Sequence, residues 1–393
     1  MNGINTQYDA IVVGGGMVGA AVALGLARNG FHVAVLEQTA PPAFVADSAP
    51  DIRVSALGYA SVSLLKSLGV WSCVEQMRCA PYRRLETWEW DEARVAFNAA
   101  DVHLPELGFM VENRVLQLAL WQCLAEQQKC DIYCPAQIQG MTRASACWQL
   151  TLQTGETLNA PLVIGADGAN SRVRQWAGIG INGWQYRQSC MLIAVDTQQP
   201  QQDCTWQQFT PQGPRAFLPL FGSWGALAWY DSPRRIRQLQ SLSLPQLDKA
   251  IMETFPARLG PVKSVSAGAF PLVRRHAQRY IADGVALVGD AAHTINPLAG
   301  QGVNLGYRDA DALIDVVTGA RDAGECWHSE AVLLRYQRRR KADNLLMQNG
   351  MDLFYNAFSN RVPPLTFARN MALLAADRAG HLKTLALKYA IGV

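Results

Sequence analysis

The chain has 393 residues, of which 49% are hydrophobic and 17% charged, and its formal net charge is +3. This length suffices for one large domain or two medium domains with a sizeable core. The charge is small and evenly spread along the chain, whereas nucleic-acid binding requires a dense basic face. Composition therefore indicates a globular protein that binds no nucleic acid.

The sequence contains no pattern typical of a membrane span, a signal peptide or a metal cluster. No stretch reaches the roughly 18 to 20 apolar residues that crossing a bilayer requires. The first apolar stretch, residues 10–13, stops at three consecutive glycines, so we expect no signal peptide. The nine cysteines include no C-x-x-C pair, and Cys130 and Cys134 lack a partnering His or Cys cluster, so we expect reduced thiols and no metal. These features favour a cytoplasmic location.

The segment YDAIVVGGGMVGAAVALGLARNGFHVAVLEQ has the pattern of a dinucleotide-binding unit. A strand at 10–13 meets Gly14, Gly16 and Gly19, and a helix then runs to about residue 29. Gly14 makes the tight turn, Gly16 lets a pyrophosphate touch the backbone, and Gly19 lets helix and strand approach closely. A second strand ends at Glu37, whose carboxylate can accept hydrogen bonds from a ribose.

A second apolar strand, at 162–164, breaks at Asp167 and Gly168, and Ser171 then begins a helix. This break has two interpretations. It is either a further cofactor-binding loop or a capped turn, because Asp-Gly is a common turn dipeptide and serine a good helix cap.

A third strand, at 285–288, ends in Gly289 and Asp290. An aspartate in this position can hold a ribityl or ribose hydroxyl. The helix that begins near Gly302 directs the positive end of its dipole into the same space. This arrangement suits a site that stabilises negative charge on a ring.

Between about 181 and 275, alternating apolar and polar runs predict antiparallel strands, with turns at 211–213 and 222–223. We expect an insertion at 76–104 to pair with this sheet, which would roof the cofactor. Aromatic residues of the sheet either line an apolar substrate pocket or fill the core. These residues are Trp206, Phe209, Phe217, Phe221, Trp224, Trp229 and Tyr230.

The chain becomes helical after about residue 320. On one helical wheel drawn over the final segment, a set of apolar residues shares one side. The set comprises Phe367, Met371, Leu374, Leu382, Leu385 and Tyr389. This side can pack onto the main body, lie on anionic lipid or bind a partner protein.

The three loops, in this order, resemble the cofactor signatures of FAD-dependent aromatic hydroxylases of the para-hydroxybenzoate hydroxylase type. The segments PDIRVSALGYASVSLLKSLGVW, MVENRVLQLALW and QGPRAFLPLF are similar to the ubiquinone-biosynthesis hydroxylases within that family. The resemblance covers residues 10 to about 310.

The resemblance implies an α/β fold with a Rossmann-like FAD-binding domain, an interleaved antiparallel substrate sheet and C-terminal helices. We expect the FAD-binding domain to be discontinuous because no linker separates the two patterns. The expected segments are 1–75, 105–180 and 276–335 for the FAD-binding domain, 76–104 and 181–275 for the substrate domain, and 336–393 for the C-terminal helical region.

The resemblance also implies site roles. Arg53 would lie over the FAD pyrophosphate, as suits a forked cation, and Gln117 would lie near the cofactor. Pro297 would shape the space beside the flavin, and His293 is either a proton-transfer group or a structural hydrogen-bond partner. Cofactor-binding residues are expected to be Gly14, Gly16, Gly19, Glu37, Arg53, Gln117, Asp167, Asp290, Pro297, Gly300, Gln301, Gly302 and Asn304.

The function implied is FAD-dependent monooxygenation of a polyprenyl benzoquinol, a demethoxyubiquinol intermediate of ubiquinone biosynthesis. NAD(P)H or another donor would reduce the flavin, and O2 would add to it as a C4a-hydroperoxide. The alternatives are a flavin-dependent reductase or dehydrogenase that inserts no oxygen, and a non-catalytic assembly module of the biosynthetic complex. A polyprenyl substrate further implies contact with the inner-membrane surface or with other ubiquinone-biosynthesis proteins. The sequence does not indicate an oligomeric state.

Overall fold

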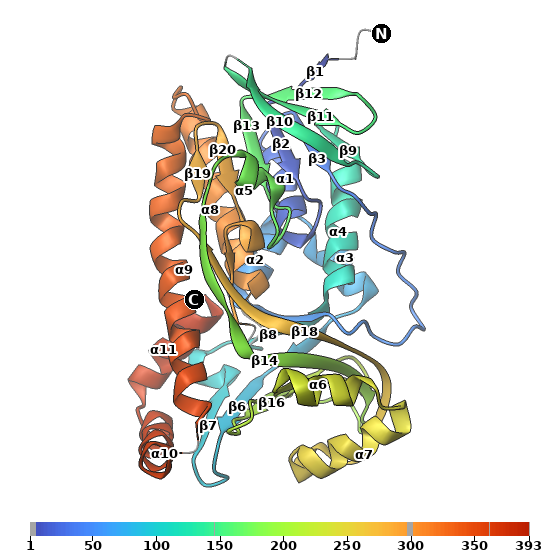
Figure 1. The fold of residues 1–393 in the computed structure, drawn as a ribbon, viewed down its shortest axis with the longest axis vertical. Helices are drawn as coiled ribbons and strands as arrows, with labels where there is room; N and C mark the ends of the chain where they lie inside the picture. Colours follow the sequence, from blue (N-terminus) through green and yellow to red (C-terminus); the bar gives the residue numbers. More distant parts are fainter. Residues whose placement is uncertain (1–4, 145, 297–301, 361, 393) are drawn as a thin grey trace.

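The computed structural model describes residues 5–144, 146–296, 302–360 and 362–392 (Figure 1). Its central sheet has six strands in the order β19-β20-β13-β2-β3-β9, all parallel except β19 at one edge. The strands are β2 (Ala10–Val13), β3 (Val33–Leu36), β9 (Cys130–Tyr133), β13 (Leu162–Gly165), β19 (Ile281–Ala282) and β20 (Val285–Leu287). The interior strands are short apolar runs that are buried along their whole length, as parallel strands covered on both faces require.

Helix α1 (Met17–Arg28) packs against this sheet and lies between α4 (Asn113–Ala125) and α8 (Gly302–Asp322). Two small sheets flank this core. One contains β1 (Asn5–Gln7), β12 (Thr157–Ala160), β11 (Cys147–Leu152) and β10 (Ile138–Ala144), and the other contains β4 (Val54–Gly58), β8 (Gly108–Glu112) and β5 (Ala80–Tyr82). The remaining short helices here are α2 (Tyr59–Ser67), α3 (Trp71–Met77), α5 (Arg172–Trp176), η1 (Ala99–Val102) and η3 (Gly289–Ala291).

A second large sheet has eight strands in the order β21-β18-β14-β17-β16-β15-β6-β7. They are β6 (Arg84–Trp88), β7 (Arg94–Asn98), β14 (Ile181–Asp196), β15 (Cys204–Gln208), β16 (Arg215–Pro219), β17 (Trp224–Asp231), β18 (Lys263–Ala277) and β21 (His293–Thr294). The sheet is antiparallel except that β6 and β15 run parallel, and β6 and β7 come from the 76–104 insertion, which pairs with the sheet as expected. The long strands β14 and β18 extend from this sheet toward the part that contains the parallel sheet (Figure 1).

Helices α6 (Pro233–Gln240) and α7 (Leu244–Thr254), followed by η2 (Ala257–Leu259), cover one face of the eight-stranded sheet. Sequence analysis predicted only strands and turns here. Trp206, Phe217 and Trp229 are buried against these helices in one apolar cluster. For these three aromatic residues, the interpretation as core holds and the interpretation as pocket lining is wrong, because the covered face of the sheet is a packed interface.

The chain ends in α9 (Glu330–Phe358), α10 (Pro363–Asp377) and α11 (His381–Ile391), with α9 running along one side of the molecule (Figure 1). Two helices replace the single predicted one, since the chain breaks at Gly380 with φ 51°. Because of the break, a side of α11 other than the predicted one faces the body. Phe367, Leu382 and Leu385 are exposed, whereas Leu387 and Ile391 of α11 are buried. The first interpretation, that the predicted apolar side packs onto the body, is therefore wrong for these residues.

The predicted fold class is confirmed: a Rossmann-like parallel sheet, a mainly antiparallel second sheet and C-terminal helices.

Candidate functional site

The carboxyl ends of β2, β3, β13 and β20 lie side by side at one edge of the parallel sheet. Val13 pairs with Leu36 on one side and with Gly165 on the other, and Gly165 pairs with Leu287. The loops that follow these strands carry Gly14, Glu37, Asp167 and Asp290. Segments far apart in sequence are thus brought to the edge where open α/β sheets bind their ligands.

The glycine-rich loop has the geometry that its spacing predicts. Gly14 has φ 102°, and a Cβ there would lie 2.4 Å from the Ala166 carbonyl oxygen. A Cβ on Gly19 would lie 1.9 Å from the Gly14 carbonyl oxygen, so only glycine lets α1 approach the loop. A Cβ on Gly16 would meet no protein atom within 4 Å. Gly14 and Gly19 serve the packing of the loop, and Gly16 faces open space.

Glu37 and α4 hold this loop from two sides. The Glu37 carboxylate accepts hydrogen bonds from the backbone N–H of Gly15 at 2.7 Å and of Gln38 at 2.8 Å. The Gly15 carbonyl accepts from Gln117 Nε2 at 2.9 Å and from Trp121 Nε1 at 2.7 Å. Gln117 therefore lies behind the loop, where it positions the backbone that would meet the phosphates.

A cavity of about 400 Å³ lies in front of the loop. Its walls are formed by Val13, Gly14, Gly16, Leu36, Glu37, Gln38, Ala136, Ile138, Ala166, Asp167, Asn170, Arg172 and Trp176. The N-terminus of α1 has no side-chain cap, so its first N–H groups are available to an anion at this end of the cavity. An acidic group, free helix amides and an apolar wall match the ribose, pyrophosphate and adenine of a dinucleotide.

Asp167 joins the second loop to this cavity and also begins α5. Its Oδ2 accepts from the backbone N–H of Arg172 at 2.7 Å and of Val173 at 3.2 Å, so the capped-turn interpretation also describes this segment. Its Oδ1 is buried and has no hydrogen-bond partner among the described residues. A buried carboxylate oxygen is costly to leave unpaired, and a cofactor hydroxyl would satisfy it. The residues present thus fit the cofactor.

The second and third loops are tied together by Arg174. Its buried guanidinium donates to the Ala291 carbonyl at 2.8 Å and to the Ala169 carbonyl at 3.1 Å, and burial lowers the pKa of the group. Asp290 lies one residue before the first of these contacts. The Asp290 residue is exposed to solvent. The protein around its carboxyl nevertheless raises the pKa of the group by desolvation, and His293 opposes this effect. Asp290 is therefore accessible to a ligand from the third loop.

His293 is buried in a network rather than presented to the cavity. Its Nε2 lies 2.5 Å from Asp309 Oδ2, and the same carboxylate accepts from Arg340 Nε at 2.9 Å and from the backbone N–H of Gly289 at 3.1 Å. Burial alone would raise the pKa of Asp309, but the charges of His293 and Arg340 and the hydrogen bonds from His293 and Asn344 hold the pKa below its usual range. This geometry favours the structural interpretation of His293: it fixes the loop that carries Asp290.

The remaining predicted residues differ in their surroundings. The Asn304 side chain contacts other protein groups: Oδ1 accepts from the Gly58 N–H at 2.9 Å and from Ser61 Oγ at 2.7 Å. It pins α8 to the start of α2. A Cβ added to Gly302, at the first turn of α8, would meet no atom of the described residues within 4 Å. Arg53 is exposed. Pro297, Gly300 and Gln301 lie outside the described residues.

Sequence reasoning missed several residues of the site. Trp121 shares the Gly15 contact with Gln117 from one turn away, and the i,i+4 spacing of two polar-tipped side chains was a usable signal. Trp176 lines the cavity from the end of α5, the helix that follows the second loop, and the 136–138 segment lines it from a part of the chain with no recognisable motif. Direct contact of any of these residues with a cofactor stays a prediction.

Comparison with known proteins agrees with this geometry. Residues 7–344 match the family model described as FAD binding domain. The chain is 61% identical over 389 residues to a protein of Escherichia coli (strain K12) named 3-demethoxyubiquinol 3-hydroxylase, covering 99% of this chain and 100% of that protein. It is 33% identical to ubiquinone hydroxylase UbiL of Rhodospirillum rubrum, covering 98% of this chain and 89% of that protein. The crystal structure of pqsL, a probable FAD-dependent monooxygenase from Pseudomonas aeruginosa, has a TM-score of 0.76 at 22% identity over 95% of this chain and 100% of that one, and so shares the fold.

Proposed function

The chain belongs to the FAD-binding domain family and, within it, to the FAD-dependent hydroxylases of ubiquinone biosynthesis, and from this premise we propose that its substrate is a demethoxyubiquinol. The reaction is hydroxylation of the ring of this polyprenyl benzoquinol with O2. The observation that carries the proposal is the cavity at the ends of β2, β3 and β13, with Gly16, Glu37 and Asp167 in its walls.

Different residues would bind different parts of the cofactor. Gly14, Gly16 and the α1 N-terminus would hold the pyrophosphate, Glu37 the adenosine ribose, and Asp290 the ribityl chain. Bound FAD, once reduced by NAD(P)H or another donor, supplies the activation of O2 and the transfer of one oxygen atom to an electron-rich ring. Gln117 and His293 position the first and third loops through the backbone.

The face of the eight-stranded sheet opposite to α6 and α7 suits a hydrophobic ring. Cys190, Ala216, Ala228, Tyr230 and Leu272 pack together there, with Met351 and Tyr355 of α9 against them. These apolar side chains would exclude water from a ring bound beside them. The quinol carries its own activating hydroxyl groups, so the chain needs to orient and desolvate the ring rather than supply a strong base.

We further propose that the protein binds a membrane surface through its C-terminal helices. None of the helices in the described ranges is both long and apolar enough to span a bilayer. More than half of the large apolar side chains that are exposed among the described residues lie between Leu346 and Tyr389. Exposed apolar side chains beside exposed basic residues such as Arg378 have the composition of a surface that lies among lipid headgroups.

Vesicle flotation tests this surface. Wild type should float with vesicles that contain anionic lipid, and the Leu382→Glu, Leu385→Glu variant should remain in the soluble fraction. The matched control is Leu244→Glu, Met252→Glu on α7, where two exposed apolar residues are also replaced. Equal flotation of wild type and the α11 variant, or equal loss in the control, contradicts the assignment of this surface.

Removal of the gene tests the substrate. The quinone pool of the deletion strain, measured by mass spectrometry, should contain a demethoxy quinone that lacks one ring oxygen substituent, and the wild-type gene should restore the mature quinone. A normal pool in the deletion strain refutes the proposed substrate.

A further inference from the structure

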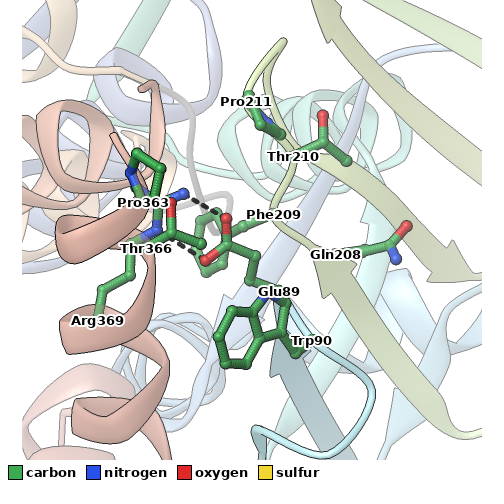
Figure 2. A pocket seen from close by; sticks show the side chains of 9 residues that line it. All are labelled: Glu89, Trp90, Gln208, Phe209, Thr210, Pro211, Pro363, Thr366 and Arg369. Carbon is green, nitrogen blue, oxygen red and sulfur yellow. Dashed lines mark hydrogen bonds and ion pairs between the residues drawn. The ribbon is translucent and has the colours of Figure 1, made fainter. Parts of the chain in front are cut away.

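A second cavity, of about 500 Å³, lies between α10 and two turns of the eight-stranded sheet (Figure 2). Glu89 and Trp90 follow β6, Gln208 ends β15 and residues 209–211 follow it, and Pro363, Thr366 and Arg369 come from α10. It shares no lining residue with the cavity in front of the glycine-rich loop, and α10 lies at the opposite end of the molecule from β2 and β13 (Figure 1). The cofactor site does not account for it.

The charges in this cavity are already paired within the chain. Arg369 donates to both carboxylate oxygens of Glu89, and its other N–H groups donate to the Ala357 carbonyl at 2.8 Å, to Asn360 Oδ1 at 3.0 Å and to the Asn360 carbonyl at 3.2 Å. All five N–H donors of the guanidinium are thereby engaged. Asn370 Nδ2 also donates to the Glu89 carboxylate, at 2.6 Å. Among the described residues that line the cavity, no charge is left unpaired to attract a phosphate or a carboxylate.

The hydroxyl groups in the walls are engaged as well. Thr210 Oγ1 donates to the Gly213 carbonyl at 2.6 Å, and Thr366 Oγ1 donates to the Val362 carbonyl at 3.2 Å. Aromatic and proline side chains supply the other surface, as Figure 2 shows for Trp90, Phe209 and Pro211. Gln208 contributes a polar amide at one side, and the rest of the described wall offers van der Waals contact, which suits a hydrocarbon chain.

Aromatic contacts connect this cavity to the face of the sheet that α9 covers. Phe209 stacks on Phe358 of α9 at a centroid distance of 4.0 Å. One turn earlier on α9, Tyr355 contacts Tyr186 at 4.7 Å, and Tyr186 packs in the cluster that contains Tyr230. Helix α9 thus presents aromatic side chains continuously from the face proposed for the quinol ring to the second cavity.

The outer rim of the cavity is also apolar. The neighbouring side chains of Trp90, Phe354, Val362, Leu365 and Phe367 are exposed, with Phe367 exposed to 58%. Large exposed aromatic and aliphatic groups around a recess mark a hydrophobic binding surface.

We infer that this cavity binds the isoprenoid tail of the substrate, with α9 forming the wall along which the tail extends from the ring. The inference rests on the proposed function, because it assigns the prenyl part of the same molecule. It also places the tail beside the C-terminal surface proposed to contact lipid, so a substrate could pass from the bilayer without exposing its tail to water.

Two variants on α10 test the tail site by steady-state kinetics in detergent. Thr366→Trp fills the cavity, and Ala372→Trp places the same ring on an exposed part of the helix outside it. Each is assayed with a demethoxyquinol bearing several isoprene units and with the same ring lacking a tail. Thr366→Trp should raise KM at least about tenfold for the prenylated substrate and leave kcat and the tail-less KM unchanged, since it removes only apolar contacts with the tail. Ala372→Trp should leave both KM values unchanged.

A photoreactive group on the prenyl chain of a non-reacting quinone gives a second measurement that is independent of turnover and of the folding of any variant. Cross-links to peptides containing 208–211 or 363–369 of the wild-type holoenzyme support the inference. Cross-links confined to other segments overturn it, as does a Thr366→Trp KM that changes equally for both substrates or for neither. Failure of wild type to hydroxylate either quinol refutes the proposed function instead, whereas the cross-linking pattern still decides the tail site.

Discussion

Replacement of Gly16 by alanine tests the binding of the cofactor without disturbing the packing of the glycine-rich loop. Gly16 has φ −68° and ψ −177°, an extended conformation that alanine adopts without strain, and the added methyl group meets no protein atom within 4 Å. Loss of glycine at the N-cap costs at most about 1 kcal/mol of stability. The apoprotein should therefore fold normally.

Binding of FAD should weaken, because the methyl group would occupy the space through which the pyrophosphate reaches the backbone N–H groups. One displaced hydrogen bond to a charged group is worth about 1.5 to 3 kcal/mol. Since each 1.4 kcal/mol is a factor of about ten, the dissociation constant for FAD should rise roughly 10- to 100-fold.

The assay is titration of the apoprotein with FAD, followed by flavin fluorescence, together with urea unfolding of the apoprotein. Gly319→Ala is the matched control, because Gly319 is exposed on α8 and its Cβ also meets no neighbouring atom. A Gly16→Ala protein that binds FAD within twofold of wild type would refute the placement of the pyrophosphate at this residue.

The other predictions concern packing, ligand contact and pH. Gly19→Ala should lower the free energy of unfolding of the apoprotein by about 1 to 3 kcal/mol, because its Cβ would lie 1.9 Å from the Gly14 carbonyl oxygen; unchanged urea unfolding would contradict this. Asp290→Ala should weaken FAD binding about 10- to 100-fold and yield nearly colourless protein, and a yellow variant with full FAD content would exclude the role given to Asp290. Burial lowers the pKa of His276 to about 4, so protons bind preferentially to the unfolded chain. The free energy of unfolding then has its full value above the unfolded pKa of about 6.5 and should fall by about 2 kcal/mol between pH 7 and pH 5, as urea unfolding measures. His276→Gln should remove this loss, and an unaltered pH dependence in the variant would count against the role given to His276.

The cofactor edge of the site was predictable because its signals are local. The spacing of Gly14, Gly16 and Gly19 encodes a turn and a close helix contact within six residues, and the apolar runs before Glu37, Asp167 and Asp290 encode parallel strands that must end at one edge. The sequence therefore sufficed to bring these residues together.

Long-range polar partners were not predictable from the sequence. The buried carboxylate that pairs with His293 is Asp309 on α8, and the cation completing the network is Arg340 on α9. Their pairing depends on how two helices pack, and no local pattern encodes that. The same holds for Asn304, whose polar side chain pins α8 to α2.

Errors arose where a helical pattern was short or broken. Helix α6 has eight residues, of which only Ile236 and Leu239 are buried, so its periodic pattern extends over about two turns, and its cover over Trp229 was missed. In the C-terminal segment, Gly380 divides what one helical wheel treated as continuous, and the buried residues Leu387 and Ile391 belong to a face that the wheel did not identify.

The most direct test of the account is the origin of the oxygen atom in the product. The purified holoenzyme is given a demethoxyquinol, NAD(P)H and ¹⁸O2, and the product is analysed by mass spectrometry. The account predicts a hydroxylated quinol that carries one ¹⁸O atom per molecule. A product without the label, or oxidation of the reductant without any hydroxylated quinol, would contradict it.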